Sequence, residues 1–175
     1  MRTINKPVLV AVITLVLVVF FAACAKKNTG SGENVTLAEI VEDLYENVDV
    51  PPYETISLDE SNFEYYAFAP YDSSYIAVAA DALVNITPHS MVVINSEDGN
   101  GEKLAKTIAE NADLNKWLCV GSEAGGVAYT DHYVVLIMSE KETVDSVIDN
   151  FREMVWKLDG MRMKLISLSN ARYDD

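Results

Sequence analysis

Histidine and cysteine, two side chains that often act in catalysis and zinc binding, are rare in this chain, and they do not cluster in the sequence. The 175 residues include two histidines, His89 and His132, and two cysteines, Cys24 and Cys119. The sequence lacks the HExxH pattern, paired cysteines and groups of histidines with nearby carboxylates, so a zinc site is not expected. We predict no metal site and no cofactor.

His89 stands directly before Ser90, a pairing of types that hydrolases use for nucleophilic attack. The pair precedes a predicted strand, and consecutive strand residues point to opposite faces of a sheet. The GxSxG turn of many hydrolases is also missing from the sequence. We therefore predict no catalytic residue and interpret His89 as a strand-end histidine that hydrogen-bonds a turn.

Two further segments resemble ligand loops but miss the required spacing. Residues 97–102 have the composition of a calcium loop, but the sixth position counted from Asp98 is Lys103, where such a loop needs glycine. We therefore predict a turn. The glycine-rich residues 121–126 precede a strand, which reverses the order of a phosphate-binding loop, and are predicted to be a flexible connection. Cys119, with apolar neighbours on both sides, is predicted to be a buried, unreactive thiol.

Cys24 ends a segment with the three parts of a bacterial lipoprotein signal. Arg2 and Lys6 are cationic, residues 8–23 form an apolar run broken only by Thr14, and two alanines precede the cysteine. We predict that residues 1–23 are a signal peptide and that Cys24 carries a diacylglycerol. An uncleaved membrane anchor is the alternative, because the run is between the length of a signal and that of a spanning helix. Both interpretations place the remaining residues outside the cytoplasm.

The rest of the chain is predicted to be a short tether at residues 24–34 followed by one domain at residues 35–175. Loss of the cations Arg2 and Lys6 with the signal would change the net charge from -14 to -16. So acidic a protein disfavours nucleic acid and anionic lipid headgroups as partners. With Cys24 lipidated, a single cysteine would remain, so no intramolecular disulfide is expected.

The apolar spacing predicts an α+β fold with an antiparallel sheet and helices packed on one face. Thr36 and Glu39 form a capping box at the start of an N-terminal helix, which two prolines end. From about residue 91 the predicted order is the split βαβ order of ferredoxin-like folds. The later elements are strands at 75–84, 91–94, 127–130, 133–138 and 163–168, a helix through 104–112, and a helix through 144–158 that follows a capping box of Ser139 and Glu142.

Two segments resemble a known protein family. The first is Ala80-Asp81-Ala82-Leu83 with Ile86 and Pro88-His89-Ser90, and the second runs from Asn111 to Val120. Together with the hairpin that ends at residues 134–139, they resemble the DUF4358 family of uncharacterised bacterial lipoproteins, over roughly residues 36–158. The resemblance implies a lipoprotein of the cell envelope and brings no catalytic residues.

Residues 53–75 are rich in aromatic side chains and are predicted to form a short strand or helical turn with a loop. Tyr65, Tyr66, Phe68 and Tyr71 are the candidate interaction surface, because aromatic residues are enriched where partners bind. The alternative is that these rings cover the open end of a small sheet.

The function expected from these patterns is a non-enzymatic, lipid-anchored domain on the extracytoplasmic face of the cell membrane. It would bind an unknown protein or another envelope component. A small-ligand or cation sensor is the second possibility, and an uncharacterised enzyme is the third.

Overall fold

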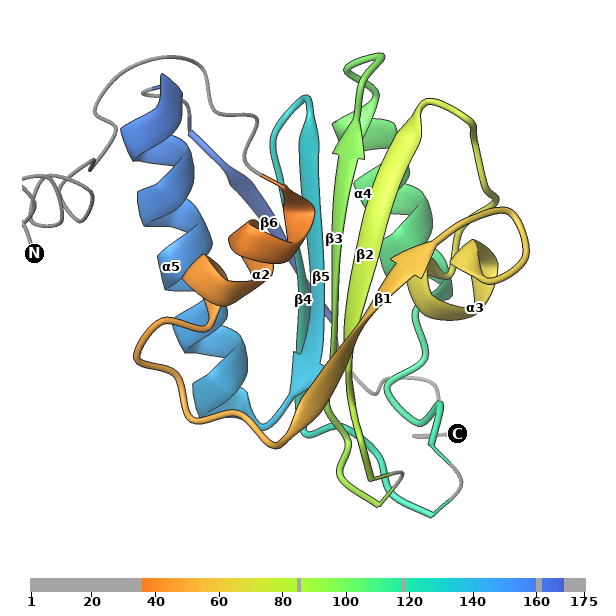
Figure 1. Ribbon diagram of the computed structural model, residues 1–175, viewed down its shortest axis with the longest axis vertical. Helices are drawn as coiled ribbons and strands as arrows, with labels where there is room; N and C mark the ends of the chain where they lie inside the picture. Colours follow the sequence, from red (N-terminus) through yellow and green to blue (C-terminus); the bar gives the residue numbers. More distant parts are fainter. Residues whose placement is uncertain (1–35, 85, 118, 160–161, 169–175) are drawn as a thin grey trace, which may run out of the picture. The chain divides into compact units, whose positions relative to one another are not determined.

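The computed structural model describes residues 36–84, 86–117, 119–159 and 162–168. The signal predicted at 1–23, Cys24 and the tether predicted at 24–34 lie outside the described residues. Figure 1 shows the elements in chain order: α2 (Leu37–Leu44), β1 (Tyr53–Leu58), α3 (Phe63–Ala67), β2 (Tyr75–Ala82), β3 (Ser90–Ser96), α4 (Gly101–Asn111), β4 (Ala124–Tyr129), β5 (Tyr133–Ser139), α5 (Lys141–Asp159) and β6 (Lys164–Leu168).

The strands form one six-stranded antiparallel sheet in the order β1-β2-β3-β5-β4-β6. The predicted α+β class, the antiparallel sheet, the N-terminal helix and the split βαβ order from β3 onward are confirmed. At α2, the Thr36 hydroxyl accepts from the Glu39 amide at 3.3 Å, and the Glu39 carboxylate accepts from the Thr36 amide at 2.7 Å. The capping box predicted there is therefore present.

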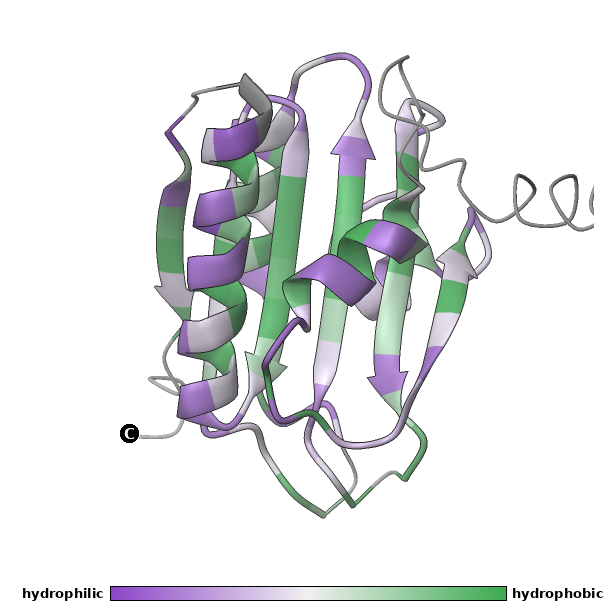
Figure 2. Ribbon diagram, turned by 60° about the vertical axis from the view of Figure 1, so that its left-hand side comes forward, coloured by the Kyte–Doolittle hydropathy of each residue, from purple (hydrophilic) through white to green (hydrophobic). Residues whose placement is uncertain are grey.

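The prediction that the helices pack on one face of the sheet is wrong. α3 and α4 cover one face, where Ile108 and Val92 belong to one core cluster, whereas α2 and α5 cover the other, where Phe151 and Val93 belong to a second. Figures 1 and 2 show the sheet between these two helix pairs, with the apolar side of α5 turned toward the strands. The domain therefore has two cores, one on each side of the sheet.

The strand order explains this arrangement. α4 connects β3 to β4 across β5, and α5 connects β5 to β6 across β4, so both crossovers run the same way along the sheet. Crossovers are almost always right-handed, and β3 and β5 are antiparallel, so the two helices must lie on opposite faces. In a ferredoxin-like sheet the last strand would return to the first, but here β2 pairs with β3 in that place.

Two local predictions also differ from the structure. Residues 124–126, predicted as part of a flexible connection, begin β4. A side chain at Gly125 or Gly126 would lie 2.7 Å from Leu114 Cδ2 or 2.9 Å from Ile148 Cδ1, so glycine lets the turn after α4 and the helix α5 approach β4. Ser139 is the last residue of β5 rather than a helix cap, and its hydroxyl lies 2.9 Å from His89 Nδ1.

Candidate functional site

The two segments that carry the family resemblance meet at one buried charge. Asp81 and Ser90 form the last residue pair between β2 and β3. The connection between α4 and β4 brings Lys116 to the same place, where its Nζ donates to Ser90 Oγ at 2.9 Å and lies 3.2 Å from Asp81 Oδ1. Segments far apart in the sequence therefore build a single charged cluster.

Lys116 is enclosed, because its side chain is 6% exposed and that of Asp81 20% exposed. The Nζ atom lies 5.7, 5.3 and 5.1 Å from the ring centroids of Tyr65, Tyr66 and Trp117, within the range of cation–π attraction. Burial lowers the pKa of the Lys116 ammonium below its ordinary value, and the Asp81 carboxylate partly offsets this effect. The ammonium is thus held by one carboxylate, one hydroxyl and three aromatic rings.

A compact turn holds Lys116 in this position. The Asp113 carboxylate accepts from the Asn115 amide at 2.9 Å, and the Asp113 carbonyl accepts from the Lys116 amide at 3.2 Å. Leu114 is buried against the α3–α4 core, and its carbonyl accepts from the Ser122 amide at 2.7 Å. The turn therefore fixes both the backbone around Lys116 and the connection that leads to β4.

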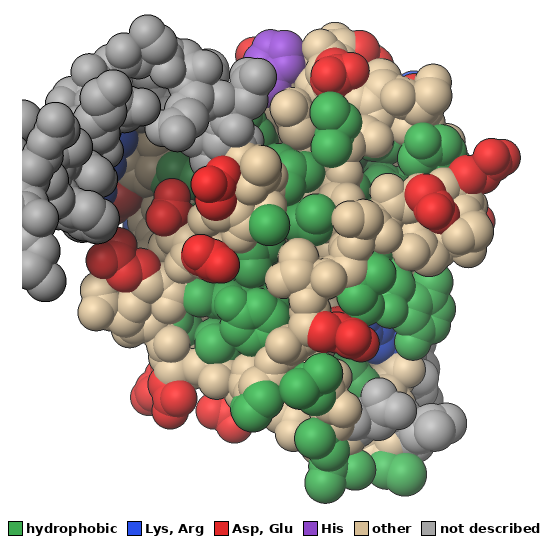
Figure 3. All heavy atoms as spheres, in the orientation of Figure 1, with side chains coloured by type: hydrophobic (Ala, Val, Ile, Leu, Met, Phe, Trp, Pro, Cys, Tyr) green, Lys and Arg blue, Asp and Glu red, His purple; other side chains and the backbone are tan. Residues whose placement is uncertain are grey.

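The loop that follows β2 carries exposed apolar side chains next to this cluster. Leu83, Val84 and Ile86, which we name the apolar tip, are 59%, 52% and 71% exposed. Their backbone is held in place, since the Leu83 amide donates to the Pro52 carbonyl and the Thr87 amide to the Val84 carbonyl, each at 2.9 Å. Figure 3 shows hydrophobic side chains gathered at the lower end of this face, over the β2–β3 connection.

The four aromatic residues predicted as an interaction surface do not lie together. Tyr65 and Tyr66, on α3, form an edge-to-face pair with ring centroids 4.9 Å apart, and both face the Lys116 ammonium. Phe68 follows α3 and packs against the core, whereas Tyr71 contacts the buried ring of Phe63. Only Tyr65 and Tyr66 therefore contribute to the charged cluster.

His89 lies on the opposite side of the sheet from Ser90, as the strand geometry predicts, and is buried. Its Nε2 is 2.8 Å from the Tyr45 hydroxyl and its Nδ1 is 2.9 Å from the Ser139 hydroxyl. Burial lowers the pKa of His89 to about 4, so the ring is neutral at pH 7. His89 therefore joins Tyr45, in the turn that ends α2, to the end of β5.

The remaining sequence candidates are surface features. Cys119, predicted to be buried, is exposed. The Asp98 carboxylate accepts from the Ser96 hydroxyl at 2.6 Å and the Asn100 amide at 3.2 Å, which closes the turn that was predicted there. His132 Nδ1 lies 3.1 Å from the Ser96 carbonyl oxygen. Within the described ranges, no three histidine, cysteine or acidic side chains lie close enough to hold a metal ion.

Lys116 was not recognised from the sequence as a site residue, although one signal pointed toward it. Residues 28–102 contain no lysine or arginine, so a buried carboxylate in this region must find its counter-ion elsewhere in the chain. That signal cannot distinguish Lys116 from Lys103 or Lys106, because the choice depends on how the chain returns after α4. The pairing with Asp81 is a property of the fold.

No protein-family model matches this chain, no curated protein matches its sequence, and no solved structure matches its fold. The resemblance to DUF4358 therefore stays a prediction. Among the described residues, none of the helices is both long enough and apolar enough for a bilayer crossing.

Proposed function

We propose that this chain is a lipid-anchored, non-enzymatic binding domain on the extracytoplasmic face of the cell membrane. Its docking surface consists of the apolar tip (Leu83, Val84 and Ile86) with Tyr65 and Trp117, and its partner is a protein of the envelope. The observation that carries this proposal is the exposure of Leu83, Val84 and Ile86, three large apolar side chains of one loop whose backbone at Leu83, Val84 and Thr87 is hydrogen-bonded.

The construction of this surface favours binding. Large apolar side chains that are exposed together mark interaction sites more often than the rest of a protein surface does. A surface that is already ordered loses less conformational entropy when a partner binds, and the hydrogen bonds of the tip supply that order. The Lys116–Asp81 pair fixes the base of the tip, because Asp81 is two residues before Leu83.

The charges around the docking surface indicate the chemistry of its partner. Glu54 lies opposite Asp81 in the sheet, and Glu64 precedes Tyr65 on α3. Since residues 28–102 contribute no cation, the surface has an acidic rim. We propose a partner face with an apolar centre and basic residues around it, because complementary charges favour correct encounter.

The histidine environments support the non-enzymatic part of the proposal. Both ring nitrogens of His89 have hydrogen-bond partners, and the Ser139 hydroxyl beside it is also buried, so a substrate has no access to this pair. A double variant, H89Q with H132Q, should keep partner binding if it melts as the wild type does. A variant that melts normally but has lost binding would contradict the proposal.

The anchor is tested by mass spectrometry of the protein purified from membranes. The wild type should lack residues 1–23 and carry a lipid on Cys24, whereas Cys24→Ala should accumulate as the unprocessed precursor. A wild-type chain that retains residues 1–23 with a free Cys24 thiol would replace the lipid anchor with a membrane-spanning one.

The docking surface is tested by replacing its apolar side chains. L83S with I86S should abolish recovery of the envelope partner in co-purification from crosslinked membranes without lowering the melting temperature. I76S is the matched control, because Ile76 is 51% exposed and lies at the other end of β2. Equal recovery with all three proteins would exclude the apolar tip as the docking surface.

A further inference from the structure

A second candidate binding surface lies at the C-terminal end of α5. A groove of about 490 Å³ is lined by Arg152, Glu153, Trp156, Arg162 and Met163, at the C-terminal end of α5 and before β6. The Trp156 side chain is 64% exposed. α5 begins beside the buried end of β5 and is roughly 28 Å long, so the groove and the apolar tip lie at opposite ends of the domain.

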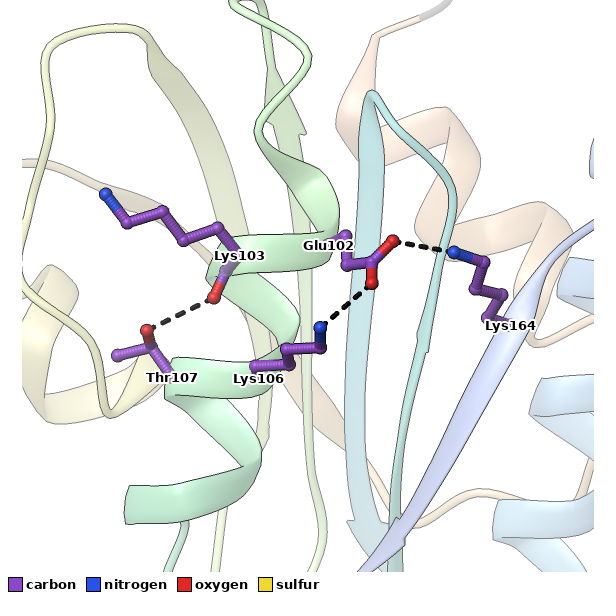
Figure 4. Close-up of polar contacts among 5 residues, drawn as sticks. All are labelled: Glu102, Lys103, Lys106, Thr107 and Lys164. Carbon is purple, nitrogen blue, oxygen red and sulfur yellow. Dashed lines mark hydrogen bonds and ion pairs between the residues drawn. The ribbon is translucent and has the colours of Figure 1, made fainter.

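The groove is part of a surface where the cations of this acidic protein are concentrated. Arg162 also lines a neighbouring hollow of about 350 Å³ with Lys164 and one carboxylate residue, Asp131. Lys164 in turn shares the Glu102 carboxylate with Lys106 of α4, as Figure 4 shows. Of the eight lysines and arginines in the described ranges, five therefore lie along this side, which we name the basic edge: Lys106, Arg152, Lys157, Arg162 and Lys164.

Some of these charges are neutralised within the domain. Arg152 pairs with Asp149, and Lys157 with Glu153 at 3.3 Å. Arg162 makes no ion pair with a described residue, and it lines the groove together with Trp156. The groove therefore offers an exposed tryptophan and an arginine that no described carboxylate neutralises.

We propose that the groove contacts the headgroups of anionic phospholipids in the membrane that anchors the chain. This inference rests on the proposed lipid anchor. Tryptophan is enriched at the level of lipid headgroups, and arginine forms two hydrogen bonds with a phosphate. The groove joins both residue types at one place.

The path of the chain puts the basic edge within reach of the anchor. The Asn150 side chain donates to the Leu44 carbonyl at 3.0 Å, and that of Thr143 to the Asp49 carbonyl at 3.3 Å, so α2 and the following segment run opposite to α5. α2 therefore begins toward the end of α5 that carries the groove. The residues between Cys24 and Thr36 can span at most roughly 40 Å.

The net charge does not prevent this contact. The sequence predicts repulsion between the whole domain and anionic lipid, but charges are screened over about 8 Å at physiological ionic strength. The acidic rim near the apolar tip lies farther away than this, at the opposite end of α5. Docking by the groove would hold the apolar tip away from the membrane, where a partner can reach it.

Tryptophan fluorescence tests the inference, because the chain contains only Trp117 and Trp156. The full-length, membrane-purified W117F variant is reconstituted into vesicles of phosphatidylcholine with or without phosphatidylglycerol, in each case with brominated acyl chains that quench tryptophan. Trp156 should be quenched in vesicles that contain phosphatidylglycerol. The W156F variant, which retains Trp117 near the apolar tip, should stay bright in both kinds of vesicle.

Charge variants sharpen the result. In the W117F background, R162Q should lower the ratio of docked to undocked protein roughly fivefold, because it removes one cation that has no carboxylate partner among the described residues. K141Q is the matched control, because Lys141 is an exposed lysine at the other end of α5.

Flotation with the vesicles separates the two proposals. Three results with protein that floats would overturn the docking inference and leave the anchor standing. Trp156 could stay bright, Trp156 could be quenched as strongly in pure phosphatidylcholine, or Trp156 could be quenched no more than Trp117. Protein that does not float would overturn the anchor and the docking inference together.

Discussion

Two lysine–carboxylate clusters in this domain have similar chemistry but opposite surroundings. At the basic edge, Glu102 accepts from Lys106 at 2.9 Å and from Lys164 at 2.6 Å, with all three side chains largely in solvent (Figure 4). Near the apolar tip, Lys116 lies 3.2 Å from Asp81 beneath three aromatic rings. The shorter contacts belong to the exposed cluster.

The pKa shifts show what burial changes. Hydrogen bonds from Lys164 and Lys106 lower the pKa of Glu102 to about 2, and the same bonds raise the pKa of each lysine. The pKa of Lys116 is lowered instead, because loss of hydration outweighs the attraction of Asp81. Pairing dominates where water screens the charges, and desolvation dominates where it does not. The buried cluster is therefore the one on which the fold depends.

The largest effect expected from this comparison is that of K116M. The variant keeps most of the aliphatic stem but leaves the Asp81 carboxylate without its counter-ion. We expect a loss of about 3 kcal/mol in the free energy of unfolding, at the lower end for a broken buried pair because Asp81 retains some solvent. Chemical denaturation at pH 7 measures this loss.

A double variant separates the charge from the packing. K116M with D81N removes both charges and should recover most of the stability that K116M loses. If K116M melts as the wild type does, or if D81N adds to its loss, then the buried pair does not hold the base of the apolar tip.

The sequence predicts the elements of this fold better than it predicts their contacts. Apolar spacing places Phe151 on the inner side of α5, where it is fully buried, and the capping box at Thr36 follows from neighbouring residues alone. The placement of α4 and α5 on opposite faces depends on where β6 pairs, and no local pattern encodes that choice. Contacts such as that of Lys116 with Asp81 depend on it in turn.

In the candidate site too, local patterns predict some features and do not predict the contacts between distant segments. Tyr65 and Tyr66 are recognisable because aromatic clusters stand out in a sequence. The exposure of Cys119 and the Tyr45 and Ser139 partners of His89 are not, since each is set by segments that meet only in the folded domain. Periodicity predicts which side of an element is buried, but it does not predict which residue lies opposite.

His89 extends the comparison to a buried group without a direct counter-ion. Its pKa is about 4 in the folded protein against an ordinary value of 6.5, so between these pH values the unfolded chain binds a proton that the folded chain does not. The contribution of neutral His89 to the free energy of unfolding should therefore be fully present above pH 6.5. The free energy of unfolding should fall by on the order of 3 kcal/mol as the pH approaches 4.

The H89Q variant is the reference for this measurement. The difference in unfolding free energy between wild type and H89Q should shrink as the pH falls from 6.5 to 4, because only the wild type loses the histidine contribution. A difference that stays constant over this range would mean that His89 titrates normally in the folded state.

The smallest effect is expected at the basic edge. K164M removes one lysine from the exposed Glu102 cluster, and surface ion pairs contribute little because water and salt screen them. The unfolding midpoint should stay within the scatter of repeat measurements at low and at high salt. A loss comparable to that of K116M would contradict the conclusion that burial, rather than pairing, makes a charged cluster structural.

The most direct test of the account is site-specific photocrosslinking in intact cells. A photoreactive residue replaces Ile86 in the apolar tip or, as the control, the equally apolar Ile76 at the other end of β2, with Cys24 unchanged in both proteins. The account predicts one discrete protein adduct from position 86, formed in the membrane fraction, and none from position 76. No adduct at position 86, or the same adducts from both positions, would contradict the proposal that this domain binds an envelope protein through its apolar tip.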